Sequence, residues 1–289
     1  MSEMPLGVST WCFNGLLPAE LRSVVDGGAP YQDEHTQAVH AYFSQLCSAI
    51  LRSMINCVEL WHSAVLHDEQ VLGQLRRLAA GCVSSMHGPF GSSLDISSSD
   101  EDVRLAGVAA SLSAADLLAK LGGKTLVVHS STPVEASDAV ERTNRCAASL
   151  GQIADHCLNL GIGVAVELLG GPFVGGSAES LAQVLRLADR VNIGVCIDVN
   201  HAFPPESLIP TVEILAPRIL GLHISDYDGV NELHRLPGEG TIDWRALIRA
   251  LHKAGYRGAF TYEARFEAEG IDQAVNIIEE NYRRLMSTR

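Results

Sequence analysis

The sequence predicts an α/β protein, a single domain of 289 residues folded as a closed (β/α)8 barrel. Short apolar or β-branched runs alternate with longer segments of helical period, and eight such pairs follow one another along the chain. The length is that of one barrel of this kind. No linker or change of composition divides residues 1–289, so a second domain is not required.

The eight predicted strands are apolar runs, and most of them lead directly into an acid or a histidine. We expect them at Leu6–Thr10, Cys57–Leu60, Cys82–Met86, Thr125–Val128, Val164–Val166, Val195–Ile197, Ile219–Leu222 and Ala259–Tyr262. A carboxylate at the end of a buried strand costs free energy unless a cation pairs with it. The strand ends therefore need a chemical explanation of their own.

Helices are predicted in most of the intervals between the strands. We expect them at about Glu34–Met54, Ser97–Leu121, Ser137–Leu160, Ala178–Asp189, Asp243–Ala254 and Ile271–Leu285. Asp100 and Glu101 are acids in a first helical turn, where they stabilise the helix, and Gly161 is a helix stop. The segment from Trp11 to about Asp33 is expected to be a polar loop. The long polar stretch ISDYDGVNELHRLPGEG is of the kind that carries function.

The ends of the third to eighth predicted strands each supply one residue of a type that binds metal ions. These residues are His87, His129, Glu167, Asp198, His223 and Glu263. Singly, each has an ordinary structural explanation, such as helix capping by an aspartate. In a barrel, however, the C-terminal strand ends meet at one mouth, where functional groups gather. Carboxylates and imidazoles placed together there suit Zn²⁺, Mn²⁺ or Fe²⁺.

Charge and composition argue against several other classes of protein. The formal net charge is −13, and no cluster of Lys and Arg is present, which disfavours a nucleic-acid partner. The seven cysteines include no CxxC pair, and we expect them to be reduced in a cytoplasmic protein. The first residues do not resemble a signal peptide, and no apolar run approaches the roughly 18 residues of a membrane span.

Several stretches resemble the xylose isomerase-like TIM-barrel superfamily over nearly the whole chain. They are IDVNHAF, LHISD, LHRLPGEGTIDW and TYEAR, together with Glu167. That superfamily includes sugar and sugar-phosphate isomerases and epimerases, inosose dehydratases and isomerases, and type IV apurinic endonucleases. These motifs are specific for the superfamily and separate its members poorly.

The resemblance implies different metal sites in the different branches. In the isomerase and epimerase branch, one divalent ion is held by four residues that match Glu167, Asp198, His223 and Glu263, and His201 matches a substrate-contacting histidine. In the endonuclease branch, three zinc ions are held by a larger set. The matching positions are His87, His129, Glu167, Asp198, His201, His223, Glu232, His234 and Glu263, with Glu232 where that branch has an aspartate.

The leading hypothesis is a divalent-metal-dependent isomerase or epimerase that acts on a small sugar, keto-sugar or polyol. Glu167 and Glu263 would remove and return a proton next to a metal-bound carbonyl. Substrate contacts are expected from His201, His234, Arg265, Trp11, Glu59 and His87. Further candidates for an apolar wall are Phe13, Phe90 and Trp61. The alternatives are an endonuclease-like phosphodiesterase with three zinc ions and an inosose-type dehydratase.

The identity of the expected metal depends on how many ions the site holds. Two Glu, one Asp and one His around a single ion favour Mn²⁺, Mg²⁺ or Co²⁺, while the added histidines of a multinuclear site favour Zn²⁺. The expected partner is a small carbohydrate, and neither nucleic acid nor membrane is expected. The apolar content is compatible with a homo-oligomer.

Overall fold

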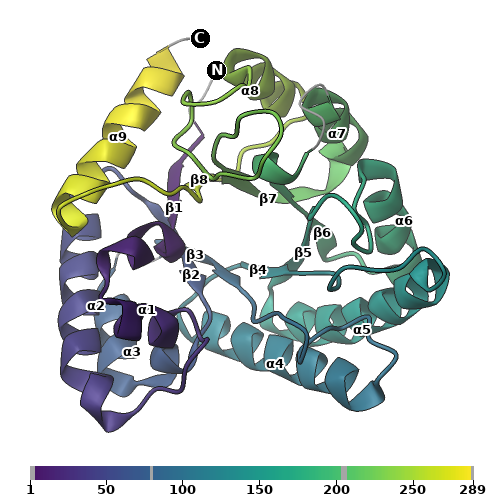
Figure 1. The fold of residues 1–289 in the computed structure, drawn as a ribbon, viewed down its shortest axis with the longest axis horizontal. Coiled ribbons are helices and arrows are strands. Elements are labelled where there is room, and N and C mark those ends of the chain that lie inside the picture. The colour runs from purple at the N-terminus through teal and green to yellow at the C-terminus, as the bar shows by residue number, and fades with distance from the viewer. Residues whose placement is uncertain (1–3, 79–80, 203–206, 288–289) are drawn as a thin grey trace.

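The computed structural model describes residues 4–78, 81–202 and 207–287, and in it parallel strands close into a barrel (Figure 1). The strands are β1 (Leu6–Ser9), β2 (Cys57–Trp61), β3 (Val83–His87), β4 (Thr125–Val128), β5 (Gly163–Glu167), β6 (Ile193–Asp198), β7 (Ile219–Ile224) and β8 (Phe260–Tyr262). Each strand pairs with the next in sequence, and β8 pairs with β1, where Phe260 lies opposite Leu6. The predicted eight-stranded TIM barrel is confirmed. Phe203, the last residue of IDVNHAF, lies outside the described residues.

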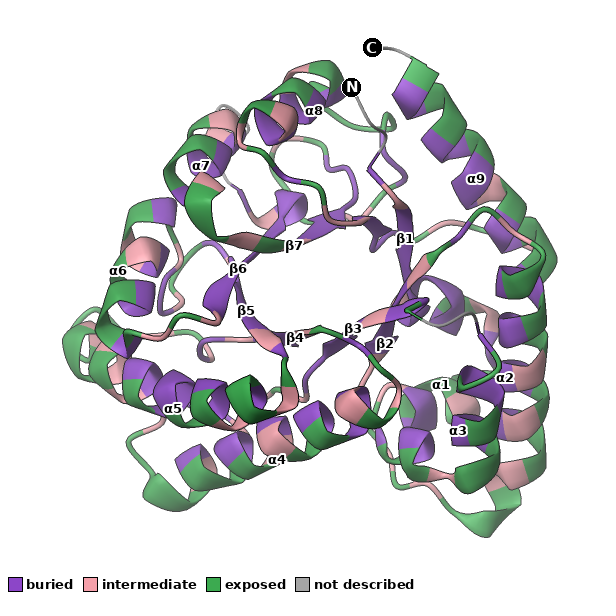
Figure 2. Ribbon diagram, turned by 180° about the vertical axis from the view of Figure 1, so that it is seen from behind, coloured by how far each residue is buried: buried purple, intermediate pink, exposed green. Residues whose placement is uncertain are grey.

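Helices surround the barrel and turn their buried sides toward it (Figure 2). They are α1 (Ala19–Val25), α2 (Thr36–Leu51), α3 (Glu69–Leu75), α4 (Glu101–Lys120), α5 (Ala139–Leu160), α6 (Ala178–Ala188), α7 (Leu208–Leu215), α8 (Trp244–Lys253) and α9 (Ile271–Ser287). In α8, for example, Leu247 and Leu251 are four residues apart and fully buried, while Arg245 and Arg249 are exposed. This spacing is that of a helix with one apolar face.

The segment after β1 is not the open polar loop that the sequence suggested. A 3-10 helix (Thr10–Leu16) and α1 occupy it. Because α1 has only seven residues and buries only Val24 and Val25, its sequence shows no helical repeat of apolar residues. The short helices α3 and α7 also had no predicted counterpart, because seven or eight residues are fewer than a helical repeat needs to be recognised. The end of α5 was predicted correctly: Gly161 follows it with a φ of 68°.

Two further observations bear on the class of protein. All seven cysteines are free, and all except the half-buried Cys57 are buried. Within the described residues, no helix combines the length and the apolar character that crossing a membrane requires.

Candidate active site

The barrel mouth at the C-terminal strand ends brings the predicted metal-type residues together. Six of them lie at or next to the last residue of a strand: His87, His129, Glu167, Asp198, His223 and Glu263. A cavity of about 480 Å³ opens at this mouth. Glu167, Asp198 and Glu263 line it, whereas His223 is 1% exposed and does not. The strand order alone therefore builds a polar floor beneath an open cavity.

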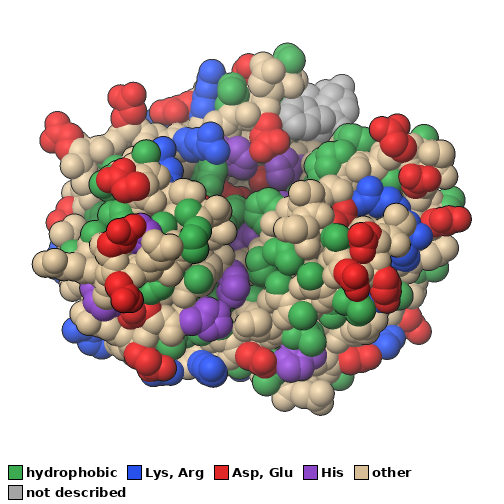
Figure 3. All heavy atoms as spheres, turned by 60° about the horizontal axis from the view of Figure 1, so that its bottom comes forward, with side chains coloured by type: hydrophobic (Ala, Val, Ile, Leu, Met, Phe, Trp, Pro, Cys, Tyr) green, Lys and Arg blue, Asp and Glu red, His purple; other side chains and the backbone are tan. Residues whose placement is uncertain are grey.

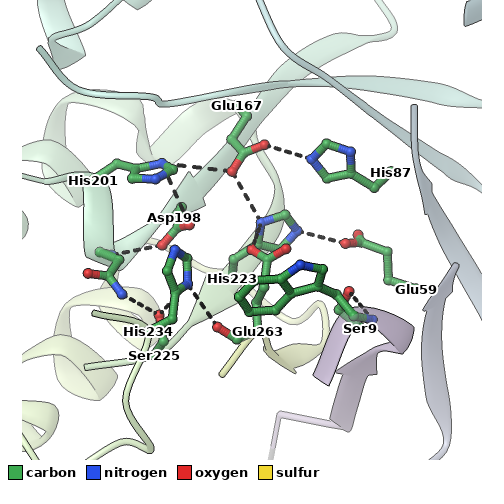
Figure 4. Close-up of polar contacts among 12 residues, drawn as sticks. Ser9, Glu59, His87, Glu167, Asp198, His201, His223, Ser225, His234 and Glu263 are labelled. Atoms are coloured by element: carbon green, nitrogen blue, oxygen red, sulfur yellow. Dashed lines mark hydrogen bonds and ion pairs between the residues drawn. The ribbon is translucent and has the colours of Figure 1, made fainter. Parts of the chain in front are cut away.

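Four buried side chains form the central group: Glu167, Asp198, His223 and Glu263 (Figure 4). One ligand-type atom from each lies within 4.8 Å of the others. Nδ1 of His223 is 2.9 Å from Oε2 of Glu263 and 3.4 Å from Oε1 of Glu167. This nitrogen and Oδ2 of Asp198 are nevertheless buried without a hydrogen-bond partner. A cation between them would satisfy both atoms, so the group is consistent with a metal site.

The charges in the central group support the same interpretation. Burial raises the pKa of Asp198 above its usual value. Burial also raises the pKa of Glu263, but the charge of His223 outweighs this effect and holds it below the usual range. Three neighbouring carboxylates in a buried site repel one another, and a divalent cation favours the ionised form of each.

A second group shares Glu167 with the first. Nε2 of His87 and Nε2 of His129 lie 3.1 Å and 3.0 Å from Oε2 of Glu167. Nδ1 of His87 donates a hydrogen bond to the carbonyl of Gly88 at 2.9 Å, which leaves Nε2 as the atom able to bind a ligand. Glu167 thus presents Oε1 to the central group and Oε2 to the second group.

A third group contains Asp198, His201 and His234, with Glu232 beside them. Nε2 of His201 and Nε2 of His234 lie 3.3 Å and 2.8 Å from Oε1 of Glu232. Each Nδ1 is 3.0 Å from a backbone carbonyl, which orients the ring. Burial lowers the pKa of both histidines, but the nearby acids outweigh it and raise the pKa of His201 to about 10 and of His234 to about 9.

Asp226 holds the loop that carries Glu232 and His234 to the mouth. Its fully buried carboxylate accepts hydrogen bonds from four N–H groups, those of Tyr227, Gly238, Ile242 and the indole of Trp244. The backbone of Asp226 also pairs with that of Arg235. These contacts hold His234 at a φ of 48°, which costs free energy in a residue other than glycine. The sequence motifs include the LPGEGTIDW stretch but do not predict its structural role in this loop.

Aromatic rings form one wall of the cavity. Trp11 and Trp61 stack with their ring centroids 6.2 Å apart, and Trp61 also stacks on His87 at 4.3 Å. Phe90 stacks on His129 at 3.9 Å. The cavity therefore has a polar floor and an apolar side, an arrangement typical of small-molecule sites.

Of two residues predicted to line the mouth, Arg265 does so and Phe13 does not. The guanidinium of Arg265 lies 4.6 Å from the centre of the Trp11 ring and lines the cavity. Phe13, in contrast, is fully buried in the hydrophobic core and does not line it. Residue 13 falls within the 3-10 helix after β1, which turns its side chain away from the expected wall.

Glu59 also lies away from the cavity at the mouth, behind His223. It is 3% exposed, and its Oε1 lies 2.9 Å from Nε2 of His223. Its Oε2 accepts a hydrogen bond from Ser85 at 2.9 Å. At this position the side chain of Glu59 does not reach the cavity in which a substrate contact was expected. The carboxylate instead faces the nitrogen of His223 that points away from the central group (Figure 4).

A protein-family model described as "Xylose isomerase-like TIM barrel" matches residues 54–281. The chain belongs to this family. The matched region contains the second to eighth strands and every residue of the three groups. The resemblance stated from the sequence motifs is confirmed at the level of the family.

Relatives and solved structures that are similar to this chain carry different names. A ketose 3-epimerase of Arthrobacter globiformis is 29% identical over 59% of this chain and 59% of its own. A probable endonuclease 4 of Thermoplasma acidophilum is 26% identical over 63% of this chain and 68% of its own. The chain spans about half to two thirds of the length of the curated relatives it matches. The crystal structure of D-allulose 3-epimerase from Methylomonas sp. in complex with D-allulose has a TM-score of 0.74 at 17% identity, covering 99% and 98% of the two chains.

Proposed function

We propose that this protein is a divalent-metal-dependent epimerase or isomerase of a small sugar, keto-sugar or polyol. The observation that carries the proposal is the buried group of Glu167, Asp198, His223 and Glu263 beside a cavity with an aromatic wall. Its unpartnered Nδ1 and Oδ2 atoms fit a cation with mixed nitrogen and oxygen ligands. The ketose 3-epimerase relative supports a sugar as the substrate.

The residues of the site suit proton exchange at a carbon atom. A divalent ion at the central group supplies positive charge that stabilises negative charge on a substrate oxygen. Glu167 and Glu263 reach this point from β5 and from the residue after β8. One carboxylate removes the proton from carbon, and the other, which exchanges its own proton with solvent between turnovers, returns a proton to the opposite face.

The remaining side chains at the mouth suit binding and orientation of hydroxyl groups. His201 and His234 line the cavity beside Glu232. Arg265 and Trp11 lie together at its side, where a polar tip and an apolar face suit a sugar ring. His87 stacks on Trp61 and lines the cavity close to Glu167. We assign these residues to substrate contact.

Deuterium exchange tests this proposal directly. The manganese-loaded protein, incubated with unphosphorylated ketohexoses in D₂O, is expected to incorporate deuterium at one carbon and to form an epimer or an aldose. NMR and chromatography measure the two events. The complete absence of incorporation across a panel of ketoses, aldoses and inososes would contradict the proposal, since proton removal from carbon is common to all its versions.

Glu59 gives a second prediction, because we assign it to the orientation of His223. A carboxylate that holds the outer nitrogen of a metal-binding histidine typically raises metal affinity by roughly 10- to 100-fold. Glu59→Leu is therefore expected to weaken Mn²⁺ binding by about 10-fold or more, measured by titration calorimetry. Glu59→Gln keeps an acceptor oxygen and should lose less. Ser85→Ala, which removes only the contact to Oε2, is the matched control.

The second and third groups favour one alternative function. Together with the central group, they offer ligands for three ions, as expected for a phosphodiesterase with a zinc cluster, and the endonuclease 4 relative supports this alternative. Against it, Arg265 is the single Lys or Arg among the described residues that line the cavity, and the net charge is −13. A phosphate backbone needs more positive charge than this. We therefore place the sugar-converting function first.

Metal analysis separates the two functions. We expect about one tightly held ion per chain, with Mn²⁺, Mg²⁺ or Co²⁺ restoring activity after removal of metal by a chelator. Saturating ion should also stabilise the fold, by about 2.7 kcal/mol at a concentration 100 times its Kd. Three zinc ions per chain in elemental analysis, with cleavage of abasic duplex DNA, would instead establish the phosphodiesterase.

A further inference from the structure

A second cavity, of about 510 Å³, adjoins the cavity at the mouth. The two cavities share Trp11, Trp61 and Phe90 as wall residues. The loops after β1, β2 and β3 build the second cavity, and Ala110 of α4 closes its outer side. Figure 3 views the molecule from this side and shows a hollow, lined by hydrophobic and histidine side chains, that leads up to the mouth. The two cavities therefore adjoin along these three aromatic rings, with the metal-type residues on the side of the mouth.

The two cavities together are larger than a single sugar ring requires. Even at the volume of one liquid water per heavy atom, about 30 Å³, the twelve heavy atoms of a hexose fill less than about 360 Å³. The cavity at the mouth alone has about 480 Å³, and the second cavity adds about 510 Å³. A hexose held at the central group leaves the second cavity unfilled.

The lining of the second cavity suits an uncharged, hydroxyl-bearing group. Phe90 keeps 44% of its surface exposed at the junction, next to the Trp61 ring. Asp26, His62 and Ser63 add polar side chains to the lining, with Oγ of Ser63 and Nε2 of His62 buried behind it. Burial lowers the pKa of His62 to about 4, so its ring is neutral at pH 7. No Lys or Arg occurs among the described residues that line the cavity, which disfavours a phosphate group there.

We propose that the second cavity is a subsite for a second sugar ring, so that the preferred substrate is a glycosylated ketose rather than a free monosaccharide. This assignment rests on the chemistry of the lining. Aromatic faces bind the C–H face of a sugar, and a carboxylate and a neutral imidazole bind its hydroxyl groups. The inference also rests on the proposed sugar-converting function, because the ketose end must reach the central group.

The test compares D-fructose with isomaltulose, a glucosyl-fructose whose ketose end is free at its first five carbons. The manganese-loaded protein is expected to turn over isomaltulose with a kcat/KM about 10-fold or more above that for fructose. Ala110→Trp places a large side chain in the second cavity, and it should reduce this ratio to about 1. Ala109→Trp, at the exposed neighbouring position on the same helix, is the matched control and should leave the ratio unchanged.

A second variant and a binding measurement keep the outcome interpretable. Ala64→Trp fills the same cavity from an exposed position at the start of the 3-10 helix after β2 (Ala64–His67), so it replaces Ala110→Trp if that variant does not fold. Equal kcat/KM values for the two sugars, or a ratio that neither variant changes, would overturn the subsite. If neither sugar is converted, calorimetry still decides: tighter binding of isomaltulose than of fructose, lost in Ala110→Trp, supports the subsite while the proposed function fails.

Discussion

Glu167→Gln is expected to lower kcat by about 10²- to 10⁴-fold, the range that a positioned proton-transfer group contributes. The substitution keeps the shape of the side chain but removes the charge that two groups of the site share. Oε1 faces His223 at 3.4 Å, and Oε2 faces His87 at 3.1 Å and His129 at 3.0 Å. Metal affinity should therefore fall together with activity. Steady-state kinetics and titration calorimetry measure the two effects.

The control for Glu167→Gln is Glu280→Gln, the same chemical change at an exposed position on α9. It should leave kcat and metal affinity at wild-type values. Circular dichroism of both variants is expected to show a folded barrel, because the neighbours of Glu167 on β5 are apolar and fully buried. Activity retained in Glu167→Gln would contradict the assignment of this residue.

Asp226→Ala is expected to have the largest effect on stability, a loss of about 2–4 kcal/mol in the free energy of unfolding. The change leaves four N–H donors without their acceptor, including those of Gly238 and the Trp244 indole. It also releases the loop that holds His234 at its positive φ. KM should therefore rise even under conditions in which the variant remains folded. Urea unfolding followed by circular dichroism gives the stability, and kinetics at low temperature give KM.

Asp228→Ala is the matched control for this second prediction. Asp228 lies in the same loop and also accepts backbone hydrogen bonds, but it is exposed. Water can replace its contacts, so the loss of stability should be much smaller. Equal effects of Asp226→Ala and Asp228→Ala would show that the buried carboxylate is not what holds the loop.

The barrel and its mouth could be predicted because they depend on strand order. Apolar runs that end in Glu167, Asp198 or His223 place those residues at one end of a parallel barrel, whatever the details of packing. The positions of Glu59 and Phe13 could not be predicted in this way. Glu59 is the middle residue of β2 and Phe13 lies in the 3-10 helix after β1, and the orientation of each side chain depends on tertiary contacts, such as that between Glu59 and His223.

The role of Asp226 shows a different limit of the sequence. An Asp after a buried strand has many ordinary explanations, and its four donors are spread over residues 227–244. Only the folded loop shows that these donors converge on one carboxylate. Short helices such as α1 were missed for a simpler reason, since two buried residues are too few to form a periodic pattern.

Closure of the barrel has a consequence for how the protein folds. The last strand joins the first, with Phe260 paired to Leu6 and Thr261 paired to Gly7, so this contact links segments that are about 250 residues apart in the chain. Contacts of such long range form late, because the entropy of closing a long loop opposes them. Glu263 directly follows β8, so the central group acquires its last carboxylate only at that step. Binding of a divalent ion should accordingly slow the opening of the β1–β8 seam, and hydrogen exchange at Phe260 and Thr261 would report it.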